Sequence, residues 1–116
     1  MIVYQYPKCS TCRTALKWLD AHNIEYVAQD IVAEPPSREA LASMVKKSGL
    51  PLARFFNTSG ESYRSGDFKT KLKTWSEDEL IAALAKDGKL IKRPLIDNGK
   101  QVLVGFAEAE YKSLQR

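Results

Sequence analysis

The chain has 116 residues, 44% of them hydrophobic, which suits one globular domain with a core and is too short for two independently stable ones. It contains no run of the roughly 18 to 20 apolar residues that a membrane-spanning helix requires. Its net charge of +4 comes from basic and acidic residues that are mixed along the sequence, so no nucleic-acid-binding surface is indicated. We therefore expect a single domain over residues 1–116, with neither a membrane nor a nucleic acid as a direct partner.

The N-terminal quarter of the sequence predicts a strand, a helix and a second strand. Ile2–Tyr6 is a short β-prone run, and residues 11–22 carry apolar side chains at helical spacing. Residues 25–31 read as the second strand. A strand, helix and strand joined by short links form a right-handed unit with parallel strands. Because the first strand begins at once, there is no room for a secretory signal before it, and we expect the protein in the cytoplasm.

The middle of the sequence predicts helices. Ser37 follows two prolines and can cap a helix that ends at Gly49. Residues 51–56 read as a short helix with an aromatic pair in the core, whereas residues 57–75 carry only a weak pattern. Ser76 begins a capping-box sequence, which opens a helix that Gly88 closes.

The last quarter predicts a hairpin and a final helix. Residues 95–96 and 101–104 flank an Asn-Gly pair, which is the strongest short-range hairpin signal, and residues 107–114 read as a helix. The full order matches an α/β fold of the thioredoxin-like, glutaredoxin type with a mixed sheet. We expect its sheet core at about residues 1–30 and 89–116, and a helical insertion at about residues 31–88.

Cys9 and Cys12 are the only cysteines, and they form a CxxC sequence at the exit of the first predicted strand. A zinc site needs about four ligands, and the only other candidate soft ligand is the single histidine, His22. A structural disulfide between the two cysteines would close too short a loop to stabilise the fold. The pattern therefore favours a redox-active pair over a metal site or two incidental thiols.

The predicted helix assigns different roles to the two cysteines. Cys9 would lie at the helix start, where unpaired N–H groups and the helix dipole favour a thiolate, and Lys8 adds positive charge beside it. We expect the pKa of Cys9 to lie below its ordinary value. Cys12 would lie one turn further along and less exposed. Cys9 is therefore the expected attacking thiol, and Cys12 the thiol that resolves a mixed disulfide.

The predicted topology also carries Arg93 and Pro94 to the cysteines. The strand that begins at Leu95 should run antiparallel to the first strand, so its start lies beside the end of that strand. We expect a cis peptide bond before Pro94. We interpret Arg93 as a guanidinium that stabilises the Cys9 thiolate or binds an oxyanion or carboxylate of the substrate, in preference to a solvated charge.

Three segments resemble the glutaredoxin-coupled arsenate reductases and Spx-type regulators: residues 6–13, 35–37 and 90–96. The likeness extends from Ile2 to about Tyr111, and it is greatest to the small CxxC-containing, arsenate-reductase-like proteins. It implies a thiol–disulfide oxidoreductase with Cys9, Cys12 and Arg93 as catalytic residues and with Lys8, Pro94 and Asn57 in support. It implies no bound cofactor and an electron donor such as glutathione, glutaredoxin or thioredoxin.

The two named branches of this family imply different alternatives. The arsenate reductases lack a cysteine at the position of Cys12 and surround the oxyanion with three arginines. Only Arg93 is matched here, because Asn57 and Gly105 stand at the other two positions, so the resemblance implies weak arsenate reduction. The Spx-type regulators share the CxxC and bind the C-terminal domain of the RNA polymerase α subunit near a glycine that corresponds roughly to Gly49. A redox-sensing regulator is therefore the alternative to an enzyme.

Overall fold

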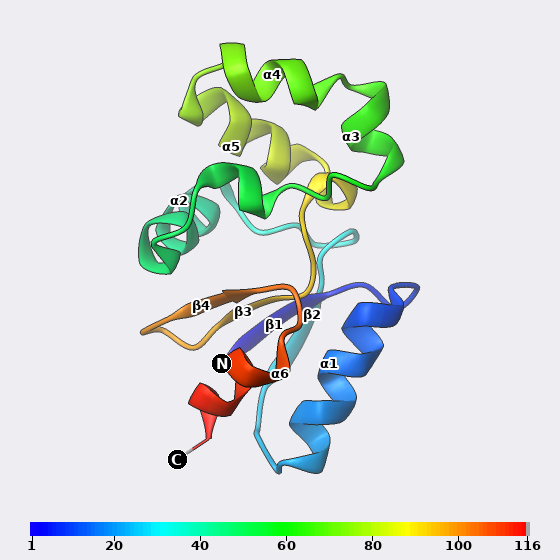
Figure 1. Cartoon of the computed structure of the whole chain (residues 1–116), viewed down its shortest axis with the longest axis vertical. Coiled ribbons are helices and arrows are strands. Elements are labelled where there is room, and N and C mark those ends of the chain that lie inside the picture. The colour runs from blue at the N-terminus through cyan, green and yellow to red at the C-terminus, as the bar shows by residue number, and fades with distance from the viewer. Residues whose placement is uncertain (116) are drawn as a thin grey trace.

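The structure is a computed structural model, and it describes residues 1–115. Its elements follow the order β1 (Ile2–Gln5), α1 (Ser10–Ala21), β2 (Val27–Asp30), α2 (Arg38–Ser48), η1 (Leu52–Phe55), α3 (Glu61–Ser65), α4 (Phe68–Thr74), α5 (Glu77–Lys86), η2 (Gly88–Leu90), β3 (Leu95–Asp97), β4 (Val102–Val104), α6 (Glu108–Tyr111) and η3 (Lys112–Leu114), where η denotes a 3-10 helix. Figure 1 shows the sheet between two helical layers, with α1 and α6 on one face and α2 to α5 on the other. In the part of the chain so described, no helix is long and apolar enough to cross a membrane.

The four strands form one mixed sheet in the order β2-β1-β3-β4. Strand β1 pairs in parallel with β2 and antiparallel with β3, and β3 pairs antiparallel with β4. The predicted strand–helix–strand unit and hairpin are thereby confirmed, as is the thioredoxin-like fold. Since Tyr4 pairs with Leu95, the end of β1 lies beside the start of β3.

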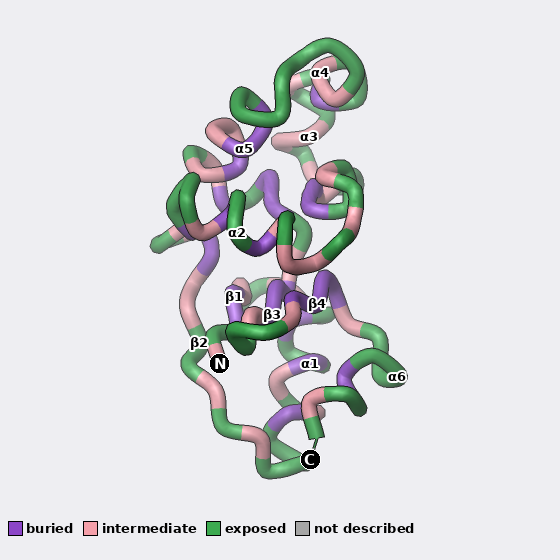
Figure 2. Tube along the Cα trace, turned by 90° about the vertical axis from the view of Figure 1, so that its left-hand side faces the viewer, coloured by how far each residue is buried: buried purple, intermediate pink, exposed green. Residues whose placement is uncertain are grey.

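Alternating side chains along the strands divide the core between the two faces of the sheet. Val3 and Ile96 pack with α1 and with Tyr111 of α6. Their neighbours Tyr4 and Leu95 pack on the opposite face against the helices between β2 and β3. Figure 2 shows buried segments in the strands and in the helices on both sides.

The predicted caps explain where two of the long helices begin. Ser37 Oγ accepts a hydrogen bond from Ala40 N at 3.1 Å, and Gly49 ends α2 with a φ of 68°. Ser76 Oγ and the Glu79 carboxylate complete the capping box at the start of α5. The end of α5 differs from the prediction, because it stops at Lys86 and Gly88 instead opens η2.

Residues 57–75, which carry only a weak pattern in the sequence, form the short helices α3 and α4. Neither is long enough to show a clear helical period. They are held by an aromatic cluster in which the Phe68 ring lies 5.7 Å from that of Phe56 and 6.0 Å from that of Trp75. Tertiary packing rather than local sequence therefore determines this part of the fold.

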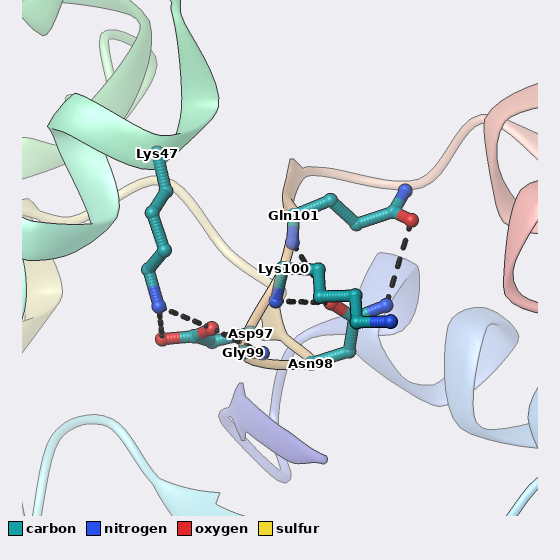
Figure 3. A network of polar contacts seen from close by, with 6 residues as sticks. All are labelled: Lys47, Asp97, Asn98, Gly99, Lys100 and Gln101. Carbon is teal, nitrogen blue, oxygen red and sulfur yellow. Dashed lines mark hydrogen bonds and ion pairs between the residues drawn. The ribbon is translucent and has the colours of Figure 1, made fainter.

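An ion pair joins the helical layer to the sheet. Figure 3 shows Lys47 of α2 reaching Asp97 at the end of β3, with its Nζ 2.8 and 2.9 Å from the two carboxylate oxygens. Asp97 Oδ1 also accepts a hydrogen bond from Gly99 N at 2.9 Å. The Asn98 side chain accepts from the backbone of Lys100 and Gln101, so it closes the loop between β3 and β4.

Candidate functional site

The two cysteines lie where β1 turns into α1. Cys9 N donates to Tyr6 O at 3.0 Å, which closes the turn, and Arg13 Nη1 donates to Pro7 O at 2.8 Å. Cys9 is the N-cap of α1, and Cys12 follows within its first turn. Both are free thiols, and Cys9 is half-buried whereas Cys12 is fully buried. The predicted placement of both cysteines on the helix is confirmed.

The Cys9 sulfur is held as an acceptor at the helix start. Its Sγ accepts a hydrogen bond from Cys12 N at 3.3 Å. Partial burial, the strongest single influence, raises the pKa of Cys9, but hydrogen bonds from Cys12 and the charge of Arg93 outweigh it. The net result is a pKa of Cys9 below its ordinary value, which favours the reactive thiolate.

The Cys12 sulfur has the opposite properties. Burial, followed by its hydrogen bond to Cys9 and the charge of Cys9, raises the pKa of Cys12 to about 12. The Tyr6 backbone and the charge of Arg93 act in the other direction but do not compensate. Cys12 therefore remains a protonated thiol that solvent cannot reach.

Arg93 lies beside this pair, as the register of β1 and β3 predicts. The peptide bond between Arg93 and Pro94 is cis, which confirms the expectation from the sequence. The guanidinium carbon of Arg93 lies 5.2 Å from the centre of the Tyr6 ring, within cation–π range. Nη1 donates to Lys89 O at 3.3 Å, whereas the buried Nε has no hydrogen-bond partner among residues 1–115.

A cavity of about 370 Å³ opens next to Arg93. Its lining comes from the turn before Cys9, from the segment around α3 and from the segment before β3: Tyr6, Asn57, Gly60, Glu61, Ser62, Ser65, Lys89 and Arg93. Asn57, predicted as a supporting residue, lies in this wall, and its Nδ2 is 3.5 Å from Lys89 O. Neither cysteine lines this polar cavity, which carries the two cations Lys89 and Arg93; Tyr6 and Arg93 connect it to the thiol pair.

The remaining candidate residues occupy different environments. Pro94 is buried and directly precedes β3. Lys8 is exposed, and its influence on the Cys9 thiolate stays a prediction. Among the described residues, no group of three or more histidine, cysteine, aspartate or glutamate side chains is arranged to bind a metal ion.

Sequence reasoning missed several residues near the thiols. Tyr111 is fully buried and donates from its hydroxyl to Gly105 O at 2.9 Å. Burial is the main cause that raises the pKa of Tyr111, and the charge of Cys12 adds to it. Lys89 and Glu61 were also missed as cavity residues. No local motif marks these three residues, because each is brought to the site by tertiary packing.

Comparisons with known proteins agree with this geometry. The ArsC family model matches residues 4–114 of the chain. The chain is 51% identical to the uncharacterized protein YusI of Bacillus subtilis (strain 168), over 94% of this chain and 92% of YusI. It is 28% identical to the global transcriptional regulator Spx of Streptococcus pyogenes serotype M3 (strain ATCC BAA-595 / MGAS315), over 92% of this chain and 78% of Spx. A solved structure described as an ArsC-family-related protein, from Bacteroides fragilis, has a TM-score of 0.95 and 47% identity, covering 98% of this chain and 96% of that one.

Proposed function

The chain belongs to the ArsC family, and from this premise we propose that it is a thiol–disulfide oxidoreductase that cycles between a Cys9–Cys12 dithiol and a disulfide. The observation that carries the proposal is the contrast between the two sulfurs. Cys9 is partly exposed with a lowered pKa, whereas Cys12 is buried with a pKa of about 12. One thiol is available to an external disulfide, and the other can react only with its neighbour.

The reaction follows from this contrast. The Cys9 thiolate attacks one sulfur of a substrate disulfide, and the bond between the two substrate sulfurs breaks. One substrate thiolate leaves and takes up a proton, while the other half stays bonded to Cys9. Cys12 then loses its proton and attacks the Cys9 sulfur, which releases the second substrate thiol and forms the Cys9–Cys12 disulfide. Two electrons pass from the protein to the substrate.

The first step also prepares the second. Two of the influences that keep Cys12 protonated are its hydrogen bond to Cys9 and the charge on Cys9. Once Cys9 is part of a mixed disulfide, it carries no charge, so the pKa of Cys12 falls. The resolving thiolate therefore forms more readily when there is a mixed disulfide for it to attack. A reductant such as glutathione, glutaredoxin or thioredoxin would restore the dithiol, and the reducing cytoplasm is the compartment we propose.

Trapping the mixed disulfide tests this proposal. The Cys12→Ser variant should accumulate a covalent adduct when it is mixed with a small disulfide such as 2-hydroxyethyl disulfide, because the resolving step is lost. The wild type should instead release both halves and become internally oxidised. The matched control is Cys9→Ser, in which the remaining thiol is buried and should form no adduct. Equal adduct formation in the two single variants would overturn the assignment of roles.

A redox-sensing regulator is the second candidate, favoured by the similarity to the regulator Spx along most of this chain. In this reading the same disulfide changes the affinity for a partner protein, and the partner we propose is the RNA polymerase α subunit. Purified α subunit should then bind the oxidised and reduced forms with different affinities. If neither form binds the α subunit, the regulator proposal fails and the oxidoreductase proposal remains.

Arsenate reduction is the weaker alternative, for a structural reason. Arg93 is the single arginine among the residues that line the cavity. Asn57 lies in the cavity wall at a position where the arsenate reductases carry an arginine. Gly105 has a φ of 78°, a conformation that side-chain-bearing residues rarely adopt, so an arginine there would be strained. A tetrahedral oxyanion would have one guanidinium where the arsenate reductases have three.

A further inference from the structure

The cavity beside Arg93 is lined by two cations and one carboxylate. We infer that it binds the carboxylate-bearing, amino-acid end of a small thiol while the sulfur of that thiol is bonded to Cys9. This inference rests on the proposed function, because it concerns the half of the mixed disulfide that remains on the protein. It adds a binding subsite and a preferred substrate chemistry to the redox reaction.

The position of the cavity supports this role. Two of its lining residues also belong to the thiol site: Tyr6 O accepts the hydrogen bond from Cys9 N, and the charge of Arg93 lowers the pKa of Cys9. A group bonded to the Cys9 sulfur can therefore extend over Tyr6 toward the cavity. A volume of about 370 Å³ lies within the range of small-molecule pockets. It suits a group the size of an amino acid.

The charges in the cavity are complementary to a zwitterion. Lys89 and Arg93 supply two cations, and Glu61 supplies one carboxylate. Among the described residues, the hydrogen bonds that Arg93 donates to Lys89 O and Ile91 O both come from Nη1, which leaves Nη2 as a further donor. Arginine and lysine donors bind carboxylates by charge-assisted hydrogen bonds. Glu61 can pair with an ammonium group, while the Asn57 amide and the Ser62 hydroxyl add uncharged polar contacts.

The test uses four symmetrical disulfides that differ in charge. Cystine carries carboxylate and ammonium groups, 3,3′-dithiodipropionate carries carboxylates alone, cystamine carries ammonium groups alone, and 2-hydroxyethyl disulfide is neutral. Adduct formation on Cys9 is followed by mass spectrometry in the Cys12→Ser background. Each rate is compared between a cavity variant and its parent for the same disulfide, so the differing reactivity of the four disulfides cancels.

The decisive variants are Lys89→Gln and its matched control Lys92→Gln. Both remove one exposed lysine charge near Arg93, but Lys92 does not line the cavity. Lys89→Gln should slow the reaction with cystine and dithiodipropionate by about threefold to tenfold, as expected for loss of one charge-assisted contact, and leave the neutral disulfide unchanged. Lys92→Gln should change the carboxylate disulfides less than twofold. Glu61→Gln should slow cystamine and accelerate dithiodipropionate.

The outcomes separate this inference from the proposed function. If the neutral disulfide reacts but Lys89→Gln and Lys92→Gln have equal effects on cystine, the cavity is not a subsite and the inference is overturned. The same conclusion follows if Lys89→Gln slows all four disulfides equally. If none of the four disulfides, the neutral one included, forms an adduct with Cys9, it is the proposed function that fails.

Discussion

Removing Cys9 should leave a folded protein whose remaining thiol is nearly inert to alkylation. The pKa of Cys12 is about 12, against 9.0 for an ordinary cysteine thiol. Each pKa unit is tenfold in the thiolate population, so at neutral pH the reactive thiolate of Cys12 is about 1,000-fold less populated than that of an ordinary cysteine. Loss of Cys9 removes two of the causes of this high pKa. Burial, the largest cause, remains, and a sulfur with 0% exposure also excludes the reagent.

Iodoacetamide alkylation of the two single variants at pH 7, followed by mass spectrometry, measures this difference. Cys9 in Cys12→Ser should react more than about tenfold faster than Cys12 in Cys9→Ser, because the burial of Cys12 persists when Cys9 is replaced. Unfolding both variants in guanidinium is the control, and the two rates should then agree. Native rates within about tenfold of one another would refute the reasoning that burial and the helix start distinguish the two sulfurs.

Three further predictions concern Arg93, arsenate and the packing of η2. Replacing Arg93 by Ala removes a positive charge that favours the thiolate, so the midpoint of pH-dependent alkylation of Cys9 should move to higher pH. Arg93→Lys keeps the charge and should shift this alkylation midpoint less. If the midpoint is unchanged in both variants, Arg93 does not act on the Cys9 sulfur. Arsenate turnover with glutathione and glutaredoxin should stay well below the order of 1 to 10 per second, and Asn57→Arg should raise it; a wild-type rate in that range would show that one arginine suffices. In Gly88→Ala the added Cβ would lie 1.8 Å from Ile31 O, so urea unfolding should show a loss of about 1 to 3 kcal/mol, and unchanged stability would contradict this packing.

Local rules predicted the thiol pair well. A β-prone run, a CxxC and a helical period place Cys9 at the N-cap of α1, and the structure confirms this. The antiparallel order of β1 and β3 then brings Arg93 to the thiols from the far end of the sequence. Ser37 and Ser76 were predictable as caps for the same reason, since a cap is decided within four residues.

The cavity could not be predicted in this way. Its walls combine Tyr6, the segment around α3 and Lys89, and α3 itself lies where the helical pattern is too short to read. The ion pair between Lys47 and Asp97 likewise joins two elements whose packing has no local signature. Tyr111 reaches Gly105 and the neighbourhood of Cys12 only because α6 packs under the sheet. These residues are selected by three-dimensional packing, which a single sequence does not display.

The central claim is that Cys9 and Cys12 form a reversible intramolecular disulfide. Its most direct test is intact mass spectrometry of the wild type after diamide treatment, with and without subsequent reduction. We expect a monomer that has lost about 2 Da, has no free thiol and regains both thiols on reduction. A protein that keeps both thiols, or that is oxidised only as a disulfide-linked dimer, would contradict the claim.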